Sequence, residues 1–371
     1  MMRRVVSILT SLVALAVPAV SAAQSGSDPA ARLAVIRIQE KRGEQERRIE
    51  QERRIEQERR VEREQRRRND DRETQTEKIS RTLNIGADGE IDVANISGDI
   101  VVTRGGGSAA TLDIVKTARA DTSEEARAIL PLVTVDVVER GPRVEVRTRY
   151  PRQDEMRQRG RRNFNVDVAY TITAPPNTRI IAKSISGDVS VTDIAGALTL
   201  ESISGSVKLA NAGRMASAKT ISGNVEMMDS RVDGALSAGT ISGVVKLQRV
   251  SARSLTLSSV SGEVLLQDVT CERIEAQAIS GDVQFSGDFE PNGRYEFASH
   301  SGNVRLAIGN KTGFQIEATS FSGGINSDLP ITLDGTQGAG RRARALRGRH
   351  GNGSAILELT SFSGSITITK R

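Results

Sequence analysis

The chain has 371 residues, a formal net charge of +6 and a single cysteine, and it contains 3% aromatic residues with no tryptophan. One cysteine excludes an intramolecular disulfide, so packing and ladder hydrogen bonds must supply the stability. The scarcity of aromatic rings disfavours stacking platforms for sugars and for single-stranded nucleic acid. We expect Cys271 to be a small packed residue at a coil corner, with a reactive thiol as the alternative.

Residues 1–23 have the pattern of a secretory signal peptide. Arg3 and Arg4 precede a short apolar stretch, and Pro18 and a small-residue tail follow it. An uncleaved membrane anchor is the alternative, but Pro18 and the small residues favour cleavage. We therefore expect a protein exported to the periplasm, the cell surface or the medium, with no nucleic-acid partner. Residues 24–30 are expected to be a linker.

Residues 31–82 are densely charged and repeat the hexad RRIEQE. Its apolar residues Ile49, Ile55 and Val61 are six positions apart and point to three different sides of a helix, so no coiled-coil seam forms. Glutamates and arginines recur at i, i+4, as in Glu50 and Arg54, which stabilises a helix. The segment predicts a long solitary charged helix, a spacer or partner-binding arm, with a partly disordered tether as the open alternative.

From Leu83 the pattern changes to the period of β-strands. Apolar residues alternate over 83–102, 111–116, 132–138, 144–148 and 166–174. One short helix is expected over 123–130, capped by Thr122 or Ser123. Residues 83–180 are therefore predicted to be a β-rich lead-in, and Gly98, 89 residues before the next motif glycine, is placed outside the regular array.

The motif Ile-Ser-Gly-x-Val recurs through the second half of the chain at intervals of 18 to 21 residues. Such a period indicates one structural unit stacked on copies of itself. Apolar residues two and four positions after each glycine predict a strand with one buried face. Residues 181–371 are therefore predicted to form an all-β parallel β-solenoid with coils of about 19 residues. The repeat glycines are Gly187, Gly205, Gly223, Gly243, Gly262, Gly281, Gly302 and Gly323, with a looser copy at Gly364 and an early one at Gly98.

Each motif also carries an apolar or aromatic residue two positions before its glycine, and we expect these side chains to form a second inward column. The glycine itself is expected to bend the chain through a positive φ, and the serine before it to hydrogen-bond the backbone or the next coil. The column consists of Ile185, Ile203, Ile221, Ile241, Val260, Ile279, His300, Phe321 and Phe362.

The Ser-Gly-Asp/Asn/Ser-Val units, the segment Asn95–Ile100 and the step Ala174–Thr178 resemble the bacterial putative-adhesin family of unknown function with β-strand repeats. The resemblance covers residues 83–371. It implies an exported or envelope-associated β-solenoid and assigns no activity. The charged segment is no part of the family pattern, and His300 stands where the family has an aliphatic residue.

No catalytic, metal-binding or cofactor-binding residues are predicted. Asp188 and Asp282 follow their glycines but are separated by several coils, so they cannot work as a pair. The motif serines are equivalent, whereas a nucleophile needs one special serine beside a base. His300 is expected to be a packed core residue, and no His or Cys cluster has ligand spacing. Most of the aromatic residues that cluster in the later coils are expected inside.

A basic insertion over 334–352 breaks the period near the C-terminus. Loops of this length in solenoids are often functional, and Arg341, Arg342, Arg344, Arg347 and Arg349 are predicted to contact an anionic envelope polymer or lipid headgroups. A hairpin that shields the last coil from edge pairing is the equally weighted alternative.

These observations predict a non-enzymatic exported scaffold, similar to an adhesin, that binds envelope or surface partners, including surface proteins. Two alternatives stay open. One is a carbohydrate-active β-helix enzyme, which would need close carboxylates in a groove. The other is a self-assembling envelope protein whose open solenoid ends pair between molecules.

Overall fold

The computed structural model describes residues 72–152, 165–309, 311–333 and 344–371. Residues Glu73–Arg371 form one compact unit, which is almost entirely β-structure. The predicted signal peptide, the linker and most of the charged segment lie outside the described residues. One part of that segment does not: Glu73–Leu83 is strand β1, not helix, and pairs antiparallel with β4. Because Thr74, Thr76, Ile79 and Leu83 suit a strand, the β-structure starts ten residues earlier than expected.

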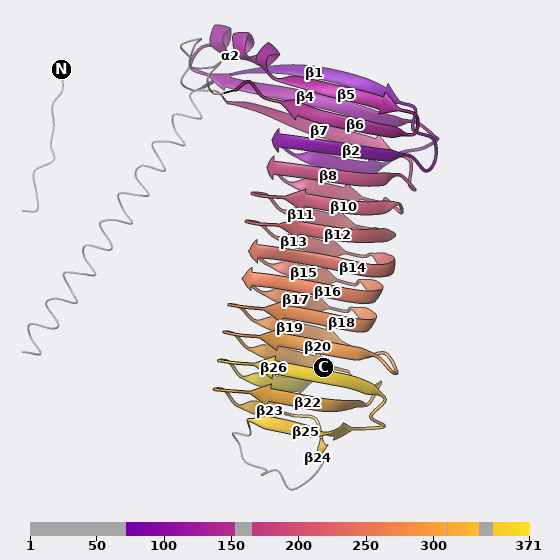
Figure 1. Ribbon diagram of the computed structural model, residues 1–371, viewed down its shortest axis with the longest axis vertical. Helices are drawn as coiled ribbons and strands as arrows, with labels where there is room; N and C mark the ends of the chain where they lie inside the picture. The colour runs from indigo at the N-terminus through magenta and orange to yellow at the C-terminus, as the bar shows by residue number, and fades with distance from the viewer. Residues whose placement is uncertain (1–71, 153–164, 310, 334–343) are drawn as a thin grey trace, which may run out of the picture. The chain divides into compact units, whose positions relative to one another are not determined.

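The unit consists of two long sheets whose strands stack in layers (Figure 1). The 13-stranded sheet contains, in spatial order, β1 (Glu73–Leu83), β4 (Ala110–Ala120), β7 (Val166–Ala174), β3 (Ile100–Arg104), β9 (Val189–Thr192), β11 (Val207–Ala210), β13 (Val225–Met228), β15 (Val245–Gln248), β17 (Val264–Gln267), β19 (Val283–Gly287), β21 (Val304–Ile308), β27 (Ile366–Lys370) and β23 (Ile325–Ser327).

The 14-stranded sheet contains, in spatial order, β24 (Thr332–Leu333), β25 (Ala345–His350), β22 (Phe314–Ser320), β26 (Ala355–Ser361), β20 (Arg294–Ser299), β18 (Thr270–Ala278), β16 (Ser251–Ser261), β14 (Arg231–Ser242), β12 (Arg214–Thr220), β10 (Ala197–Ser202), β8 (Arg179–Ser186), β2 (Glu90–Ser97), β6 (Arg143–Arg149) and β5 (Thr134–Arg140). Helix α2 (Ser123–Ile129) begins where predicted, with the Thr122 hydroxyl accepting from the Glu125 N–H at 3.2 Å, and a 3-10 turn, Leu130–Leu132, follows it.

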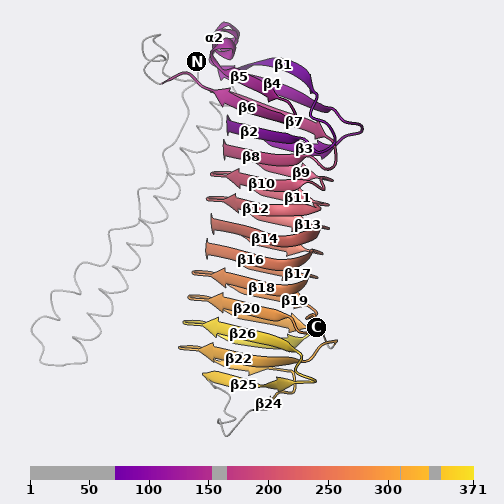
Figure 2. The same cartoon turned by 45° about the vertical axis from the view of Figure 1, so that its right-hand side comes forward.

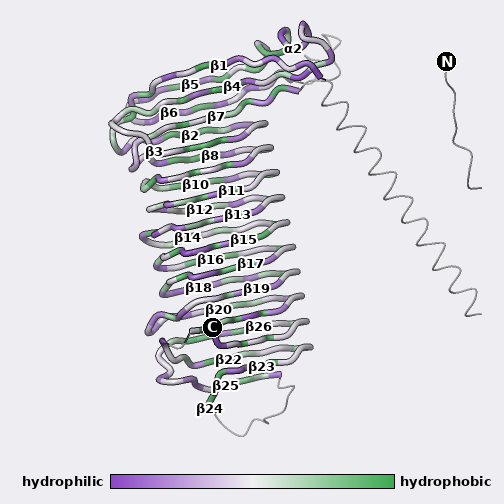
Figure 3. Tube along the Cα trace, turned by 180° about the vertical axis from the view of Figure 1, so that it is seen from behind, coloured by the Kyte–Doolittle hydropathy of each residue, from purple (hydrophilic) through white to green (hydrophobic). Residues whose placement is uncertain are grey.

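Each regular coil consists of one strand of the 14-stranded sheet, a turn that contains the repeat glycine, and one strand of the 13-stranded sheet. Equivalent strands pair in parallel and in register, so Val189, Val207 and Val225 lie one above another. Residues two and four positions after the repeat glycines are buried as predicted, except Ser327 after Gly323, and hydropathy alternates along the strands (Figure 3). Most aromatic side chains of the later coils also pack inside, with Phe289 and Tyr295 stacked at 4.1 Å, whereas Phe321 and Phe362 are exposed. The predicted parallel solenoid is confirmed.

The order of coils in space differs from their order in the chain at both ends (Figure 2). The coil β2–β3 lies between β6–β7 and β8–β9, so the Gly98 turn stacks directly on the Gly187 turn. The last coil in sequence, β26–β27, is inserted between β20–β21 and β22–β23. The expectation that Gly98 lies outside the array was therefore wrong, because sequence distance does not measure spatial distance when a later segment folds back beyond the first coil.

The repeat glycines are needed mainly because successive turns approach one another very closely. A Cβ built on Gly262 would lie closer than 3.0 Å to the carbonyl oxygen of Gly243 in the neighbouring coil, and the other stacked repeat glycines show the same contact. Only three of the repeat glycines, Gly98, Gly187 and Gly243, have φ in the left-handed region. The predicted positive φ is thus a minor reason, and close backbone approach is the general one.

The same contact predicts the cost of adding a methyl group at a repeat glycine. We expect Gly262→Ala to lower the free energy of unfolding by about 1–3 kcal/mol, the range of overpacking substitutions, measured by guanidinium unfolding. Gly324→Ala is the matched control, because a Cβ there meets nothing within 4 Å in the turn beside Gly323. Equal stability of the two variants would contradict the proposed role of close approach.

Candidate functional site

A ladder of inward hydroxyl groups, which we call the hydroxyl ladder, lies three positions before the repeat glycines. Each hydroxyl donates to the carbonyl oxygen of the repeat glycine in the neighbouring coil; Thr220 reaches Gly205 at 2.8 Å and Thr240 reaches Gly223 at 2.9 Å. We predicted this role for the serine directly before the glycine, which was wrong by two positions. The ladder consists of Ser202, Thr220, Thr240, Ser259, Ser299, Ser320 and Ser361.

A second ladder of polar side chains follows the glycines. The Asp188 carboxylate accepts from the Ser206 N–H at 2.8 Å, and the Asn224 amide oxygen accepts from the Val244 N–H at 2.9 Å. Asp282 does the same for Asn303 at 2.8 Å. The Asp/Asn/Ser of the motif therefore connects one coil to the next through an N–H group, and this explains why that position is polar.

The residues two positions before the glycines are exposed, and the predicted inward column is wrong. Their exposed fractions run from 38% at Ile96 to 64% at Phe321. The strand before each glycine buries residues at odd offsets, such as Leu198, Leu200 and Ser202, so the even offset faces outward. These side chains form a row on the outer surface, here called the exposed ladder: Ile96, Ile185, Ile203, Ile221, Ile241, Val260, Ile279, His300, Phe362 and Phe321.

The end of the exposed ladder is aromatic. The His300 ring stacks on Phe362 at 4.7 Å, and Phe362 stacks on Phe321 at 4.8 Å, with interplanar angles of 9° and 2°. His300 is therefore an exposed member of a stack and not the core residue we expected. The centroid spacing equals the separation of neighbouring strands, about 4.8 Å, so the ladder follows the coil repeat.

A groove of about 760 Å³ lies beside the first part of the exposed ladder. Six ladder residues line it, from Ile96 to Val260, together with the outward side chains of the adjacent row, among them Lys183, Glu201 and Lys219. Nothing in our sequence analysis indicated this groove. The sequence does carry a signal for it, because Leu198 and Leu200 alternate as the buried residues of a strand do, and their parity requires Ile203 to face outward.

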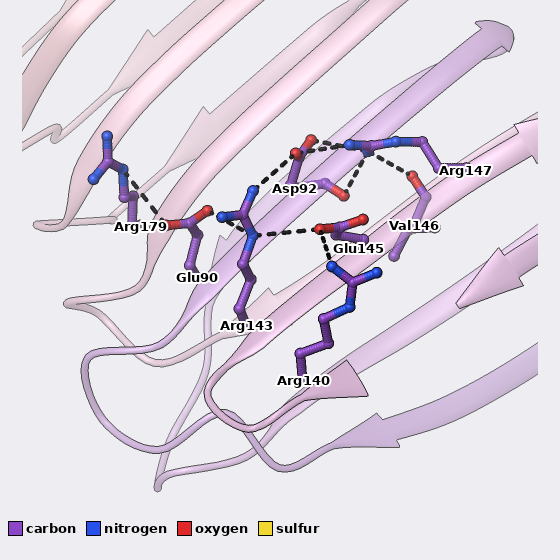
Figure 4. Close-up of polar contacts among 8 residues, drawn as sticks. All are labelled: Glu90, Asp92, Arg140, Arg143, Glu145, Val146, Arg147 and Arg179. Carbon is purple, nitrogen blue, oxygen red and sulfur yellow. Dashed lines mark hydrogen bonds and ion pairs between the residues drawn. The ribbon is translucent and has the colours of Figure 1, made fainter. Parts of the chain in front are cut away.

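One end of the groove is formed by Arg147, whose position is fixed by a network of ion pairs on β2, β6 and β8 (Figure 4). Arg147 donates to both carboxylate oxygens of Asp92, at 2.9 and 2.7 Å. The hydrogen bond to Asp92 raises the pKa of Arg147, against the opposing effect of burial. Arg143 extends the network to Glu90 at 3.2 Å and to Glu145 at 3.6 Å. A charge held in this way cannot swing freely into the groove.

The residues considered for catalysis do not come together. Asp188 and Asp282 lie in coils separated by those of Ser206, Asn224, Val244 and Glu263, and both serve the ladder after the glycines. Cys271 is buried and donates to the Arg273 carbonyl at 2.9 Å. Burial raises the pKa of its thiol to about 11, which keeps it protonated near neutral pH and fits the predicted packing role.

The structure describes part of the basic insertion. Residues Ala345–His350 form β25, which pairs antiparallel with β22 and β24 at the end of its sheet. Arg347 is paired with Glu317, whereas Arg344 and Arg349 are exposed. Arg341 and Arg342 lie outside the described residues. The pairing on β22 is what the alternative interpretation, a hairpin that shields the last coil, requires.

The described ranges contain no group of three or more His, Cys, Asp or Glu residues placed to hold a metal ion. None of the helices in those ranges has the length and apolar character needed to span a bilayer.

Comparison with known families decides the classification. The family described as Toastrack DUF4097 matches residues 36–369. The chain belongs to this family. The match agrees with the resemblance recognised in the repeat motif. It also includes part of the charged segment, so the expectation that this segment lies outside the family pattern was wrong. None of the curated proteins matches this Toastrack chain.

Several solved structures are similar to the Toastrack chain over most of its length, at low sequence identity. A putative adhesin from Bacteroides fragilis is 15% identical, with 80% of this chain and 97% of that chain covered and a TM-score of 0.40. A putative lipid binding protein from Parabacteroides distasonis is 13% identical, with 79% and 96% covered and a TM-score of 0.37. A putative adhesin from Parabacteroides merdae is 10% identical, with 81% and 96% covered and a TM-score of 0.34.

Among the regular coils, one position of the hydroxyl ladder carries no hydroxyl, Ala278, three positions before Gly281. At another, Ser184, the buried hydroxyl has no hydrogen-bond partner among the described residues. We expect Ala278→Ser to raise the free energy of unfolding by about 1 kcal/mol, because a hydroxyl there can donate to the Gly262 carbonyl. The reciprocal variant Thr240→Val should lower it by about 1–2 kcal/mol by leaving the Gly223 carbonyl without its donor. Guanidinium unfolding of both variants measures these changes in the free energy of unfolding. Changes of the same sign in the two variants would contradict the proposed role of the hydroxyl ladder.

Asp282 predicts a pH dependence. Burial raises the pKa of its carboxyl, but the Asn303 N–H and the Arg305 guanidinium outweigh burial, so the net shift is downward. Because the pKa of Asp282 is lower in the folded than in the unfolded protein, the ionised carboxylate stabilises the fold. This contribution is fully present above the unfolded pKa of about 3.9 and is lost as the pH falls through the folded pKa. Asp282→Asn replaces the carboxylate oxygen that accepts from the Asn303 N–H by an amide oxygen that can do the same, and removes the charge.

We therefore expect Asp282→Asn to be less stable than the parent protein at pH 7, with the difference shrinking below about pH 4. Denaturant unfolding at a series of pH values measures this difference. A constant difference down to pH 2 would show that the ion pair with Arg305 contributes nothing.

Proposed function

We propose that this Toastrack chain is a non-enzymatic, exported β-solenoid scaffold that binds cell-envelope or surface partners. The observation that carries the proposal is the exposed ladder, a row of apolar and aromatic side chains on the outer surface of successive coils. Contiguous apolar surface of this kind is typical of binding sites. The solenoid presents it at a fixed spacing, because each ladder position is set by backbone pairing on both sides.

The polar residues of the motif support a non-catalytic role. Asp188, Asp282 and Asn224 accept backbone N–H groups of the next coil, and the inward hydroxyls donate to glycine carbonyls. Groups used in this way are structural. A glycosidase would need two carboxyl groups within about 10 Å, whereas five coil steps of about 4.8 Å separate Asp188 from Asp282.

Self-assembly through the solenoid ends is less well supported than lateral binding. The terminal strands at the C-terminal end are short, with three residues in β23 and two in β24. Short edge strands resist pairing with other chains. At the other end, β1 presents charged side chains such as Glu77 and Lys78 along the edge. The exposed ladder is therefore the better candidate for contact with a partner.

The partner classes that fit are a surface protein, an envelope lipid or an anionic polymer. The neighbouring structures described as adhesins and as a lipid binding protein agree with the first two classes. Arg341, Arg342, Arg344, Arg347 and Arg349 are the proposed contacts for an anionic polymer or lipid headgroups, with Arg347 partly neutralised by Glu317. The signal peptide of residues 1–23 would deliver the chain to the periplasm, the surface or the medium.

A pull-down from envelope extracts tests the proposal. The mature chain is compared with Phe321→Ser/Phe362→Ser, which alters the most exposed end of the ladder, and with a variant that replaces Arg341, Arg342, Arg344 and Arg349 by serine. We expect the phenylalanine variant to lose most of the components retained by the parent chain, because aromatic anchors contribute strongly to binding. Loss only in the arginine variant would indicate the basic insertion instead. Retention of nothing by the parent chain would refute the proposal.

A further inference from the structure

The groove beside the exposed ladder has one apolar wall and one polar wall. Its apolar wall is aliphatic: Ile96, Ile185, Ile203, Ile221, Ile241 and Val260. The opposite wall is the adjacent outward row, two residues earlier on each strand, in which Lys183, Glu201 and Lys219 follow one another across successive coils. Rows two residues apart on one strand are separated by roughly 6.6 Å, so the space between them fits a slender molecule.

The polar wall stops abruptly at Gly239. Lys219, Gly239 and Ser258 are register partners in three successive coils. The row therefore changes from the long side chain of Lys219 to a glycine, which has none. Ser237, two residues before Gly239 on the same strand, also lines the groove. The Ser258 hydroxyl covers Gly239 and lies 2.7 Å from the place that a Cβ would occupy. Lys219, Ser237 and Ser258 therefore put one cation and two hydroxyl groups around this glycine.

The charges along this wall leave one of them uncompensated. Lys183 is paired with Glu201 at 3.1 Å, and Arg147 is held by Asp92. Among the described residues, Lys219 makes no ion pair or hydrogen bond. Its ammonium group is thus free to bind an anion beside Gly239, and the Ser237 and Ser258 hydroxyls can donate to the same anion.

We propose that the groove binds one long-chain fatty acid, with its carboxylate at Lys219 over Gly239. The hydrocarbon tail lies along Ile221, Ile203, Ile185 and Ile96. Three coil steps of about 4.8 Å separate the first and last of these side chains, about 14 Å in all. That length matches an acyl chain, since one leaflet is half of the ~30 Å hydrocarbon core of a bilayer. The groove volume of about 760 Å³ lies within the usual range of ligand sites.

A second copy of the chain fits the same surface less well. A copy packed along the exposed ladder would cover all of it, including Ile279, His300 and Phe362, whereas the groove ends at Val260. It would also have to accommodate the unpaired Lys219. The inference rests on the proposed function, because it names a ligand for a binding protein, but it concerns a part of the ladder away from the phenylalanines altered in the pull-down.

Calorimetric titration of the mature full chain with palmitate, below its micelle concentration, tests the site. We expect one palmitate per chain. Ile203→Asn and Lys219→Glu should each weaken binding about tenfold or more, equivalent to about 1.4 kcal/mol. Ile279→Asn is the matched apolar control, an exposed ladder residue outside the groove. Lys246→Glu is the matched charge control, a lysine on the outer face of β15.

Circular dichroism and thermal unfolding establish that the variants fold, which their exposed positions favour. Absence of palmitate binding by the parent chain overturns the proposal, as does equal weakening by the controls. A concentration-dependent dimer in sedimentation that Ile279→Asn dissociates would also overturn it, by showing that the ladder is covered by a second copy. If palmitate fails to bind while the envelope pull-down still depends on Phe321 and Phe362, only the groove assignment is wrong.

Discussion

The whole solenoid depends on how closely one glycine turn lies on the next. A Cβ at any stacked repeat glycine would collide with the carbonyl of its neighbour, so the coils can reach the spacing of a β-ladder at the turn only because that atom is missing. The close approach also brings the carbonyl within reach of the hydroxyl three positions before the next glycine, as in Thr220 and Gly205. One steric requirement thus fixes the register of both sheets and determines where the polar residues of the motif must lie.

The second corner of the coil uses a different solution to the same problem. Asp193, Asn211, Asp229, Arg249 and Asp268, each six positions after a repeat glycine, have φ between 50° and 60°. Aspartate and asparagine tolerate this conformation better than other residues with a Cβ. Arg249 is the exception, and its guanidinium binds both carboxylate oxygens of Asp229 at 2.5 and 2.9 Å. Here side chains have room, because they lie on the outer surface and can pair between coils.

Much of the fold could be predicted from the sequence because the repeat is so regular. The spacing of the motif correctly predicted parallel coils. The alternation after each glycine correctly predicted that the valines are buried. The error at Ile185 and its equivalents arose because parity was continued through the glycine turn, which changes the phase by one residue. The change of phase was not evident from the sequence, because Ser202 and Thr220 are polar and were not expected to be buried. Their hydroxyls are buried because each donates to a glycine carbonyl. The insertion of β2–β3 and of β26–β27 between other coils left no local signal, because identical motifs pair equally well in either order.

The groove shows why a regular array can still have one specific site. Most positions of the repeat are constrained from coil to coil: the glycine by its neighbour, the inward positions by the core and the polar positions by hydrogen bonds. The outward row that contains Lys183, Glu201, Lys219, Gly239 and Ser258 has no such constraint, and it varies in size and charge from coil to coil. A ligand in the groove can distinguish one coil from another through this row, while the exposed ladder beside it supplies a uniform apolar surface. In a solenoid of this kind, affinity comes from what the coils share and specificity from where they differ.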